Sequence, residues 1–345
     1  MKIAIVAPIA IKIPPDKYGG SEFVVYYLTE ELVKRGHEVD LYATGDSKTS
    51  ANLVGVVPTG LWNTQDFKDI PSCCLSMLYQ LVDSGKKYDV IHEHLGPYGT
   101  VLSRLTSTPV LTTLHTPVTR CRAKLYEQVK DNFYLASISD NQRKDYPDLN
   151  YIDTVYNGVP VNDYEFSSES GEYLCFLGRF DNIKGAREAI DLALATGEKL
   201  VMAAKIEDEE YFKKYVEPKI DNEKIVYIGE VDFKQKVELL KNAKALVSLI
   251  NWDEPFGLVV PEANACGTPV IVNPRGAFPE LVEDGLNGFI TDGSPESAIE
   301  AVGKISQIDR AKCRKFVEEK FSIEKMVDNY EAVYKKMAGI KNEKA

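Results

Sequence analysis

Short runs of Val, Ile and Leu alternate with helix-length segments from one end of the chain to the other. Residues 2–8 (KIAIVAP) form the first apolar run, and the segment 21–36 follows it after a loop. In that segment Val24, Leu28 and Leu32 recur at intervals of four residues, which indicates a helix with one buried face. Alternation of strand and helix patterns is typical of β–α–β units and parallel sheets.

These units occur in two series, and a polar segment without a period separates them. Strands of the first series are predicted at residues 2–8, 37–43, 88–94, 109–115, 133–139 and 153–159. Strands of the second series are predicted at residues 171–180, 199–206, 224–230, 245–250, 268–274 and 287–292. The sequence therefore predicts an α/β fold with two doubly wound Rossmann-like domains facing a cleft, where such folds bind ligands. The predicted domains span residues 1–165 and 166–322, with a linker near 160–172.

Composition narrows the range of functions. The chain has 345 residues and a net charge of -11, which disfavours nucleic acid as a partner. Its six cysteines show no C-x-x-C spacing, so we expect reduced thiols rather than disulfides or a metal framework. No apolar run approaches the ~18 residues of a membrane span, and the first residues lack a signal-peptide pattern. We therefore expect a cytoplasmic protein without a transmembrane segment. Nothing in the pattern indicates an oligomeric state.

Two glutamates bracket an apolar stretch at residues 251–263 (NWDEPFGLVVPEA). A buried strand precedes this stretch, and a helix is predicted to begin at Gly257. Glu254 then precedes the helix, and Glu262 lies about one and a half turns inside it. The amides of residues 256–258 at the helix start could bind an anion, and the carboxylates could accept hydrogen bonds from sugar hydroxyls. Taken alone, a capping acid and a solvated helix acid explain the two glutamates as well.

Basic and glycine residues follow other predicted strands. Arg179 and Lys184 (LGRFDNIKG) lie at the end of the strand at 171–180, where both could bind a phosphate. A surface basic pair is the alternative. Gly19 and Gly20 directly precede the first helix and would allow a phosphate or sugar close to the backbone, although a plain turn explains them equally well. The G-x-G-x-x-G dinucleotide fingerprint is absent after the first strand.

Three histidines follow two predicted strands of the first series. His115 lies at the carboxyl end of the strand at 109–115, where ligands bind in such folds, so we expect it in the site. His92, Glu93 and His94 follow YDVI and end the strand predicted at 88–94. A metal site is disfavoured because alternate residues of a strand face opposite directions. We expect Glu93 or His94 on the acceptor side of the cleft.

Taken together, these pieces resemble the family-4 retaining nucleotide-sugar glycosyltransferases, which have the two-domain GT-B fold. The most specific signal is the E-x7-E stretch EPFGLVVPE, followed by ACGTPVIV. Companion motifs appear in the expected order over nearly the whole chain: YGGSE, DVIHEH, LTTLHTP, SISD, YNGV, LGRFDNIKG, YIGEV and RGAFPELVEDGLNGF.

The resemblance implies roles for individual residues. Arg179 and Lys184 would bind the donor diphosphate, Glu262 the ribose hydroxyls, and Glu254 the transferred sugar. Backbone groups would contact the sugar, the phosphates and the base, and His115 would touch the sugar near the reacting centre. The donor-binding residues implied in this way are Gly19, Gly20, Val231, Phe256, Gly257, Leu258 and Glu262; the implied catalytic residues are His115, Arg179, Lys184 and Glu254.

The resemblance also implies the chemistry. A hexose would pass from a nucleotide-diphosphate sugar, UDP-glucose-like or GDP-mannose, to a hydroxyl of a sugar, glycan or small-molecule acceptor. The anomeric configuration would be retained by front-face attack, with no metal and no cofactor. The first domain would hold the acceptor, and the second domain the donor nucleotide. A final helix at residues 323–345 would cross back to the first domain.

Other functions remain open on the same fold. One is another sugar-nucleotide enzyme, such as an epimerase, which should lack the ordered set of Arg179, Lys184, Glu254 and Glu262. Another is a non-catalytic protein that binds sugar nucleotides, which a broken site would favour. A dehydrogenase is disfavoured by the missing glycine fingerprint.

Overall fold

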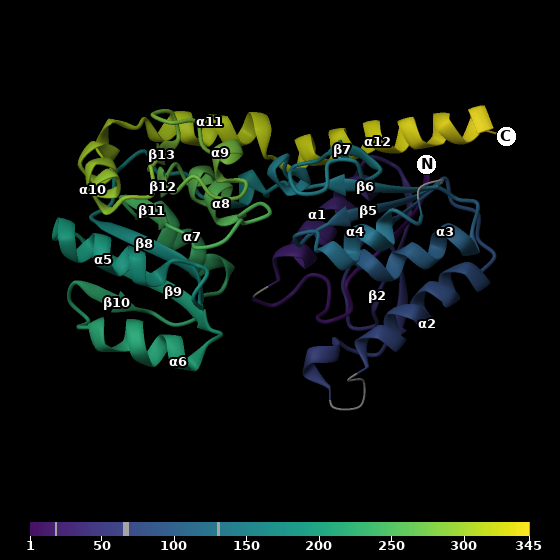
Figure 1. Cartoon of the computed structure of the whole chain (residues 1–345), viewed down its shortest axis with the longest axis horizontal. Coiled ribbons are helices and arrows are strands. Elements are labelled where there is room, and N and C mark those ends of the chain that lie inside the picture. The colour runs from purple at the N-terminus through teal and green to yellow at the C-terminus, as the bar shows by residue number, and fades with distance from the viewer. Residues whose placement is uncertain (18, 65–68, 130–131, 345) are drawn as a thin grey trace. The chain divides into compact units, whose positions relative to one another are not determined.

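The chain folds into two α/β units, each built around one parallel sheet (Figure 1). The structure is a computed structural model and describes residues 1–17, 19–64, 69–129 and 132–344. The N-terminal unit comprises Met1–Gly158 and Ile323–Ala345, and the C-terminal unit comprises Val159–Ser322. The prediction of two doubly wound parallel sheets is therefore confirmed.

The sheet of the N-terminal unit has the strand order β3-β2-β1-β4-β5-β6-β7. Its strands are β1 (Lys2–Val6), β2 (Glu38–Thr44), β3 (Asn52–Val57), β4 (Val90–Glu93), β5 (Val110–Leu114), β6 (Phe133–Ser137) and β7 (Tyr151–Thr154). The α-helices of this unit are α1 (Gly20–Lys34), α2 (Ile70–Asp83), α3 (Leu102–Leu105), α4 (Arg120–Tyr126) and α12 (Ile323–Lys344). Every residue of β5 and β6 is buried, as expected for central parallel strands covered on both faces.

The last helix, α12, packs on the N-terminal unit, as predicted. Its apolar stripe of Met326, Val327, Tyr330, Val333 and Tyr334 is buried. Its polar side reaches α1 and the turn after it: Arg35 donates to Asp328 at 2.7 Å, and His37 is 2.8 Å from Glu331. An amphipathic helix of this kind is held mainly by its buried face.

The sheet of the C-terminal unit has the strand order β10-β9-β8-β11-β12-β13. Its strands are β8 (Tyr173–Phe180), β9 (Lys199–Ile206), β10 (Ile225–Tyr227), β11 (Ala245–Ser248), β12 (Val270–Val272) and β13 (Gly288–Ile290). Its α-helices are α5 (Ala186–Thr196), α6 (Glu209–Tyr211), α7 (Phe233–Lys241), α8 (Val259–Ala265), α9 (Phe278–Leu281), α10 (Pro295–Lys304) and α11 (Arg310–Lys320). All pairings in this sheet are parallel, so the carboxyl ends of its strands share one edge.

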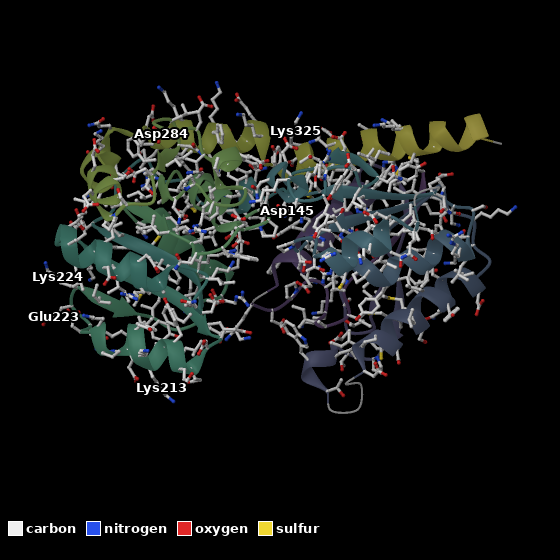
Figure 2. All side chains as sticks on the ribbon, in the orientation of Figure 1. Asp145, Lys213, Glu223, Lys224, Asp284 and Lys325 are labelled. Atoms are coloured by element: carbon white, nitrogen blue, oxygen red, sulfur yellow. The ribbon has the colours of Figure 1, made fainter. Side chains whose placement is uncertain are left out.

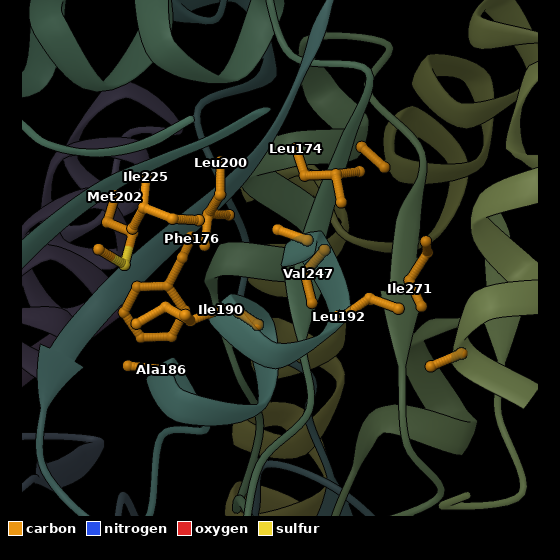
Figure 3. Close-up of a cluster of buried hydrophobic side chains, with 14 of the residues drawn as sticks. Leu174, Phe176, Ala186, Ile190, Leu192, Leu200, Met202, Ile225, Val247 and Ile271 are labelled. Atoms are coloured by element: carbon orange, nitrogen blue, oxygen red, sulfur yellow. The ribbon is translucent and has the colours of Figure 1, made fainter. Parts of the chain in front are cut away.

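A hydrophobic core lies between the C-terminal sheet and its helices (Figure 3). Phe176 of β8 and Met202 of β9 pack with Ile190 of α5, and none of the three is more than 2% exposed. Charged side chains such as Lys213 and Lys224 project from the surface of the unit instead (Figure 2). Within the part of the chain that the structure describes, no helix has the length and apolar character needed to span a membrane.

Three local features differ from the prediction. Strand β3 was not expected. Helix α8 begins at Val259 rather than Gly257, because Gly257 has φ +94°, a left-handed conformation that a right-handed helix does not contain. Tyr164, within the predicted linker near 160–172, is buried: it is 2% exposed, and its carbonyl accepts a hydrogen bond from Arg314 at 2.7 Å.

Candidate active site

Three charged residues of the candidate site, Arg179, Lys184 and Glu254, lie at or just after the carboxyl ends of β8 and β11. Arg179 is the penultimate residue of β8, and Lys184 follows in the next loop. In that loop Asp181 Oδ1 accepts hydrogen bonds from the amides of Ile183 and Lys184 at 3.1 and 3.0 Å. The tight turn directs the Lys184 side chain to Glu254 in the loop after β11, where the two form an ion pair. Two residues that the sequence placed in one site are therefore in contact.

Two glycines allow these loops to approach one another. Gly185 has φ +79°, and a Cβ there would lie 2.1 Å from the carbonyl oxygen of Leu249. Gly276 has φ +59°, and a Cβ there would lie 2.3 Å from both the backbone nitrogen and the oxygen of Glu254. Only glycine fits such close backbone contacts at positive φ. The positions of Lys184 and Glu254 thus depend on residues outside the charged motif.

Trp252 completes the surroundings of Glu254. Its indole Nε1 donates a hydrogen bond to Glu254 Oε2 at 3.0 Å, the same oxygen that receives Lys184. The Lys184 ammonium also lies 4.9 Å from the centre of the Trp252 ring. A cation is attracted to the face of an aromatic ring, so the three side chains form one cluster. The prediction did not include Trp252.

Arg179 has two acidic neighbours. Its guanidinium lies 3.2 Å from Asp181 and 3.9 Å from Glu207. Glu207 also pairs with Lys205 of β9 at 3.0 Å, and these two cations hold the pKa of Glu207 below its usual range, Lys205 more than Arg179. The Nε of Arg179 is buried and has no hydrogen-bond partner among the described residues. Arg179 therefore retains a donor that a ligand could use.

Glu262, on α8, is also held by a cation. Its Oε1 accepts a hydrogen bond from Lys236 Nζ at 2.6 Å and another from the Tyr164 hydroxyl at 2.8 Å. The side chains of Glu262 and Lys236 are only 12% and 18% exposed. Sequence reasoning found Glu262 but missed both partners, because Tyr164 lies in the predicted linker and Lys236 on an otherwise ordinary amphipathic helix.

The other predicted donor-binding residues of this unit lie in loops. Phe256 is 2% exposed and packs edge-on against Phe321, with ring centres 6.0 Å apart, so its side chain belongs to the core. Gly257 and Leu258 directly precede α8. Val231 lies between β10 and α7, next to Asp232, which caps α7. A ligand contact by Phe256 can therefore come only from its backbone.

In the N-terminal unit, Gly19 caps α1 and Gly20 is its first residue. Gly19 has φ +154°, and a Cβ there would lie 2.7 Å from Pro15 Cγ. The tyrosine of the YGGSE motif, residue 18, lies outside the described residues. Gly19 therefore occurs where the chain needs it for its own packing, and a role of Gly19 or Gly20 toward phosphate stays a prediction.

Three histidines of this unit, His92, His94 and His115, form a cluster in which His92 and His94 are buried and His115 is partly buried. His94 Nδ1 is 2.8 Å from His115 Nε2, and the rings of His92 and His94 are 4.3 Å apart. His92 also bonds Thr113 and, on α12, Tyr334, each at 2.7 Å. Burial lowers the pKa of His115 to about 4, and it lowers the pKa values of His92 and His94 well below the usual range. All three rings are therefore neutral near pH 7.

Glu93 points away from these rings. Its carboxyl group is fully buried, where it accepts hydrogen bonds from the Thr112 hydroxyl and the Leu95 amide. Burial raises the pKa of Glu93 to about 8, so the group is mostly protonated at neutral pH. An acceptor-side role for Glu93 or His94 stays a prediction. Across the described ranges, no group of three or more His, Cys, Asp or Glu side chains is placed to hold a metal ion.

Known proteins resemble the chain over most of its length. The family model described as Glycosyltransferase Family 4 matches residues 18–162, and the model described as Glycosyl transferases group 1 matches residues 164–321. An uncharacterized 41.2 kDa protein in the cps region of Klebsiella pneumoniae is 30% identical over 203 residues, which are 54% of this chain and 55% of that protein. D-inositol 3-phosphate glycosyltransferase of Mycolicibacterium smegmatis is 24% identical over 332 residues, covering 80% of this chain and 75% of that enzyme.

A solved structure shares the fold. Anabaena HepE, in complex with UDP and glucose, superposes with a TM-score of 0.72 at 18% identity, covering 96% of this chain and 98% of that chain. Such a likeness concerns the fold alone, whereas the two family models together cover every strand of the two sheets except β1. The chain therefore belongs to glycosyltransferase family 4 and has the GT-B fold of these enzymes.

Proposed function

We propose that the chain transfers a hexose from a nucleotide-diphosphate sugar to a hydroxyl acceptor, with retention of anomeric configuration and without a metal. One observation carries the proposal. At the carboxyl edge of the C-terminal sheet, each glutamate of the E-x7-E motif is paired with a lysine, and Arg179 lies at the end of β8. This edge therefore holds both cations, which can bind phosphates, and carboxylates, which can accept hydrogen bonds from sugar hydroxyls.

In the proposed reaction, Arg179 and Lys184 stabilise the diphosphate as it leaves. In the structure Lys184 is paired with Glu254, and Arg179 is shared by Asp181 and Glu207. A bound diphosphate recruits both cations, because it carries more negative charge than any single carboxylate. Charge that is positioned where it develops in the transition state is a large source of rate acceleration. Glu254, partly released from Lys184, then accepts a hydrogen bond from a hydroxyl of the transferred sugar.

The transfer itself uses the leaving group as base. The acceptor oxygen forms a bond to the anomeric carbon on the face from which the diphosphate departs. The bond between the anomeric carbon and the phosphate oxygen breaks, and the acceptor proton moves to that phosphate oxygen. No side-chain nucleophile is needed. His115, neutral because burial lowers its pKa to about 4, offers the sugar a hydrogen bond rather than a charge.

The donor in this proposal is a UDP-hexose or GDP-mannose, and the acceptor a sugar, glycan or small molecule. Support comes from two relatives: HepE is known in complex with UDP and glucose, and the Mycolicibacterium enzyme is named for inositol 3-phosphate. The N-terminal unit would hold the acceptor and the C-terminal unit the donor nucleotide.

Release of nucleoside diphosphate tests the proposal. The chain would be incubated with UDP-glucose, UDP-galactose, GDP-mannose or ADP-glucose and a panel of sugar acceptors, with and without EDTA. We expect one donor to release its nucleoside diphosphate equally well in EDTA, with the original anomeric configuration in the product by NMR. Lys213→Met is the matched control for loss of Lys184, since Lys213 is exposed and paired only weakly with Glu209 at 3.5 Å. No release from any donor, an inverted product, or activity that requires added metal would overturn the proposal.

A further inference from the structure

The two hydrogen bonds that Glu262 accepts end on the same oxygen. Lys236 Nζ and the Tyr164 hydroxyl both donate to Oε1, at 2.6 and 2.8 Å. A carboxylate has two oxygens and about four acceptor positions. No described residue donates a hydrogen bond to Glu262 Oε2, so this oxygen is the one that the chain leaves to a ligand.

Lys236 is itself fixed by its surroundings. Its ammonium lies 5.5 Å from the ring centre of Tyr164 and 5.3 Å from that of Phe233. The two rings pack edge to face, 5.2 Å apart, and Tyr164 is only 2% exposed. A lysine ordinarily retains much side-chain freedom, but here two aromatic rings and a carboxylate restrict it. The Glu262 carboxylate is therefore oriented by contacts within the chain itself.

The charge of Lys236 also affects what can bind next to Glu262. An unpaired carboxylate would repel the diphosphate of a donor, since like charges disfavour each other most where water is partly excluded. The ion pair cancels this charge while leaving Oε2 as an acceptor. A hydrogen bond to an ionised carboxylate is roughly twice as strong as one between neutral groups.

We propose that Lys236, together with Tyr164, is a positioning residue that orients Glu262 to accept hydrogen bonds from the ribose hydroxyls. The site would then bind ribonucleotides more tightly than 2′-deoxyribonucleotides. This inference rests on the proposed function. Lys236 acts through Glu262 and does not contact the ribose. Its loss should therefore change the selectivity between the two sugars and not merely weaken all binding.

Calorimetric titration with UDP, GDP and ADP, each beside its 2′-deoxy counterpart, measures that selectivity. The variants are Lys236→Met, which removes the charge at similar length, and Tyr164→Phe, which removes one hydrogen bond to Oε1. Lys241→Met is the matched control, because Lys241 lies on the same helix and also pairs with two carboxylates, Glu165 and Glu238. A melting curve of each variant shows whether it is folded.

The wild type should bind the ribonucleotide about 10-fold more tightly than the deoxy form, as expected for one charge-assisted hydrogen bond. We expect that ratio to approach one in Lys236→Met, to fall partway in Tyr164→Phe, and to be unchanged in Lys241→Met. A folded Lys236→Met protein that keeps the wild-type ratio, even with weaker binding overall, overturns the inference while the proposed function stands. Absence of nucleotide binding by the wild type overturns the proposed function, and the inference with it.

A double variant gives a second test. If Lys236 acts through Glu262, the ratio in Glu262→Ala should already be near one, and adding Lys236→Met should not lower it further. A further fall of the ratio in the double variant would mean that Lys236 recognises the nucleotide directly, contrary to the inference.

Discussion

The ammonium of Lys184 and the carboxylate of Glu254 form an ion pair, although 70 positions separate the two residues in the sequence. Both side chains are largely buried, at 20% and 14% exposed. The pair places a cation and an acceptor side by side at the carboxyl edge of the C-terminal sheet. In the proposed function, a donor diphosphate competes with Glu254 for Lys184. Binding of the donor therefore frees Glu254 to accept a hydrogen bond from the transferred sugar.

Replacing Lys184 with Met should slow turnover more than it weakens donor binding. The cation is needed most when charge develops on the departing diphosphate, and loss of one such group typically costs about 100-fold or more in kcat. Steady-state kinetics with varied donor separate kcat from KM. A rise in KM with unchanged kcat would contradict the assigned role.

The same variant should be less stable, because it leaves Glu254 partly buried without its cation. In a double-mutant cycle of Lys184→Met with Glu254→Gln, we expect a coupling free energy of about 1 kcal/mol or more. Free energies of unfolding from urea titrations give this value. Additive effects would mean that the pair contributes nothing to stability.

Gly185→Ala should disrupt the loop that carries Lys184. The added Cβ would lie 2.1 Å from the Leu249 carbonyl oxygen at φ +79°, so we expect a loss of about 2 kcal/mol or more in the free energy of unfolding. Gly303→Ala is the control, because Gly303 lies in α10 with open space around it and should be neutral or gain about 0.5–1 kcal/mol. Equal effects of the two substitutions would contradict this account of the loop.

Because Glu93 is buried, we expect the free energy of unfolding to depend on pH. Its folded-state pKa is raised from 4.5 to about 8 by burial, so between these values the folded state holds a proton that the unfolded state has lost. The free energy of unfolding should therefore fall as the pH rises from 4.5 to about 8, by up to about 1.4 kcal/mol for each pH unit. Glu93→Gln does not ionise and should escape the loss.

Urea unfolding of both proteins at pH 5 and pH 8 tests this prediction. The free energy of unfolding of Glu93→Gln minus that of the wild type should be larger at pH 8 than at pH 5. A difference that does not change with pH would show that Glu93 ionises normally.

The course of the fold could be read from the sequence because its central strands are buried and largely apolar. Val110–Leu114 and Ala245–Ser248 are runs of this kind, bounded by polar residues. Strand β3 (Asn52–Val57) could not be predicted from the sequence, because it is a half-exposed edge strand that Gly55 interrupts. A Cβ at Gly55 would lie 2.9 Å from Gly45 Cα, a contact between segments that no local pattern encodes.

The candidate site divides in the same way. Arg179, Lys184, Glu254 and Glu262 carry a recognisable spacing, and the structure pairs each with an opposite charge. The partners that orient them were not predictable. Tyr164 and Lys236 lie 98 and 26 positions from Glu262, and a long-range contact of this sort leaves no periodic signal. Trp252 was visible in the motif, but its hydrogen bond to Glu254 depends on loop geometry that only the folded chain defines.

Calorimetric titration of UDP, GDP and ADP into the wild type and Glu262→Ala tests the central claim most directly. The proposed function predicts that one of these nucleotides binds the wild type, that EDTA does not change its affinity, and that Glu262→Ala weakens it by about 10-fold or more. Failure of all three nucleotides to bind the wild type, or equal affinity for the wild type and Glu262→Ala, would contradict the claim that this edge of the C-terminal sheet holds a nucleotide-sugar donor.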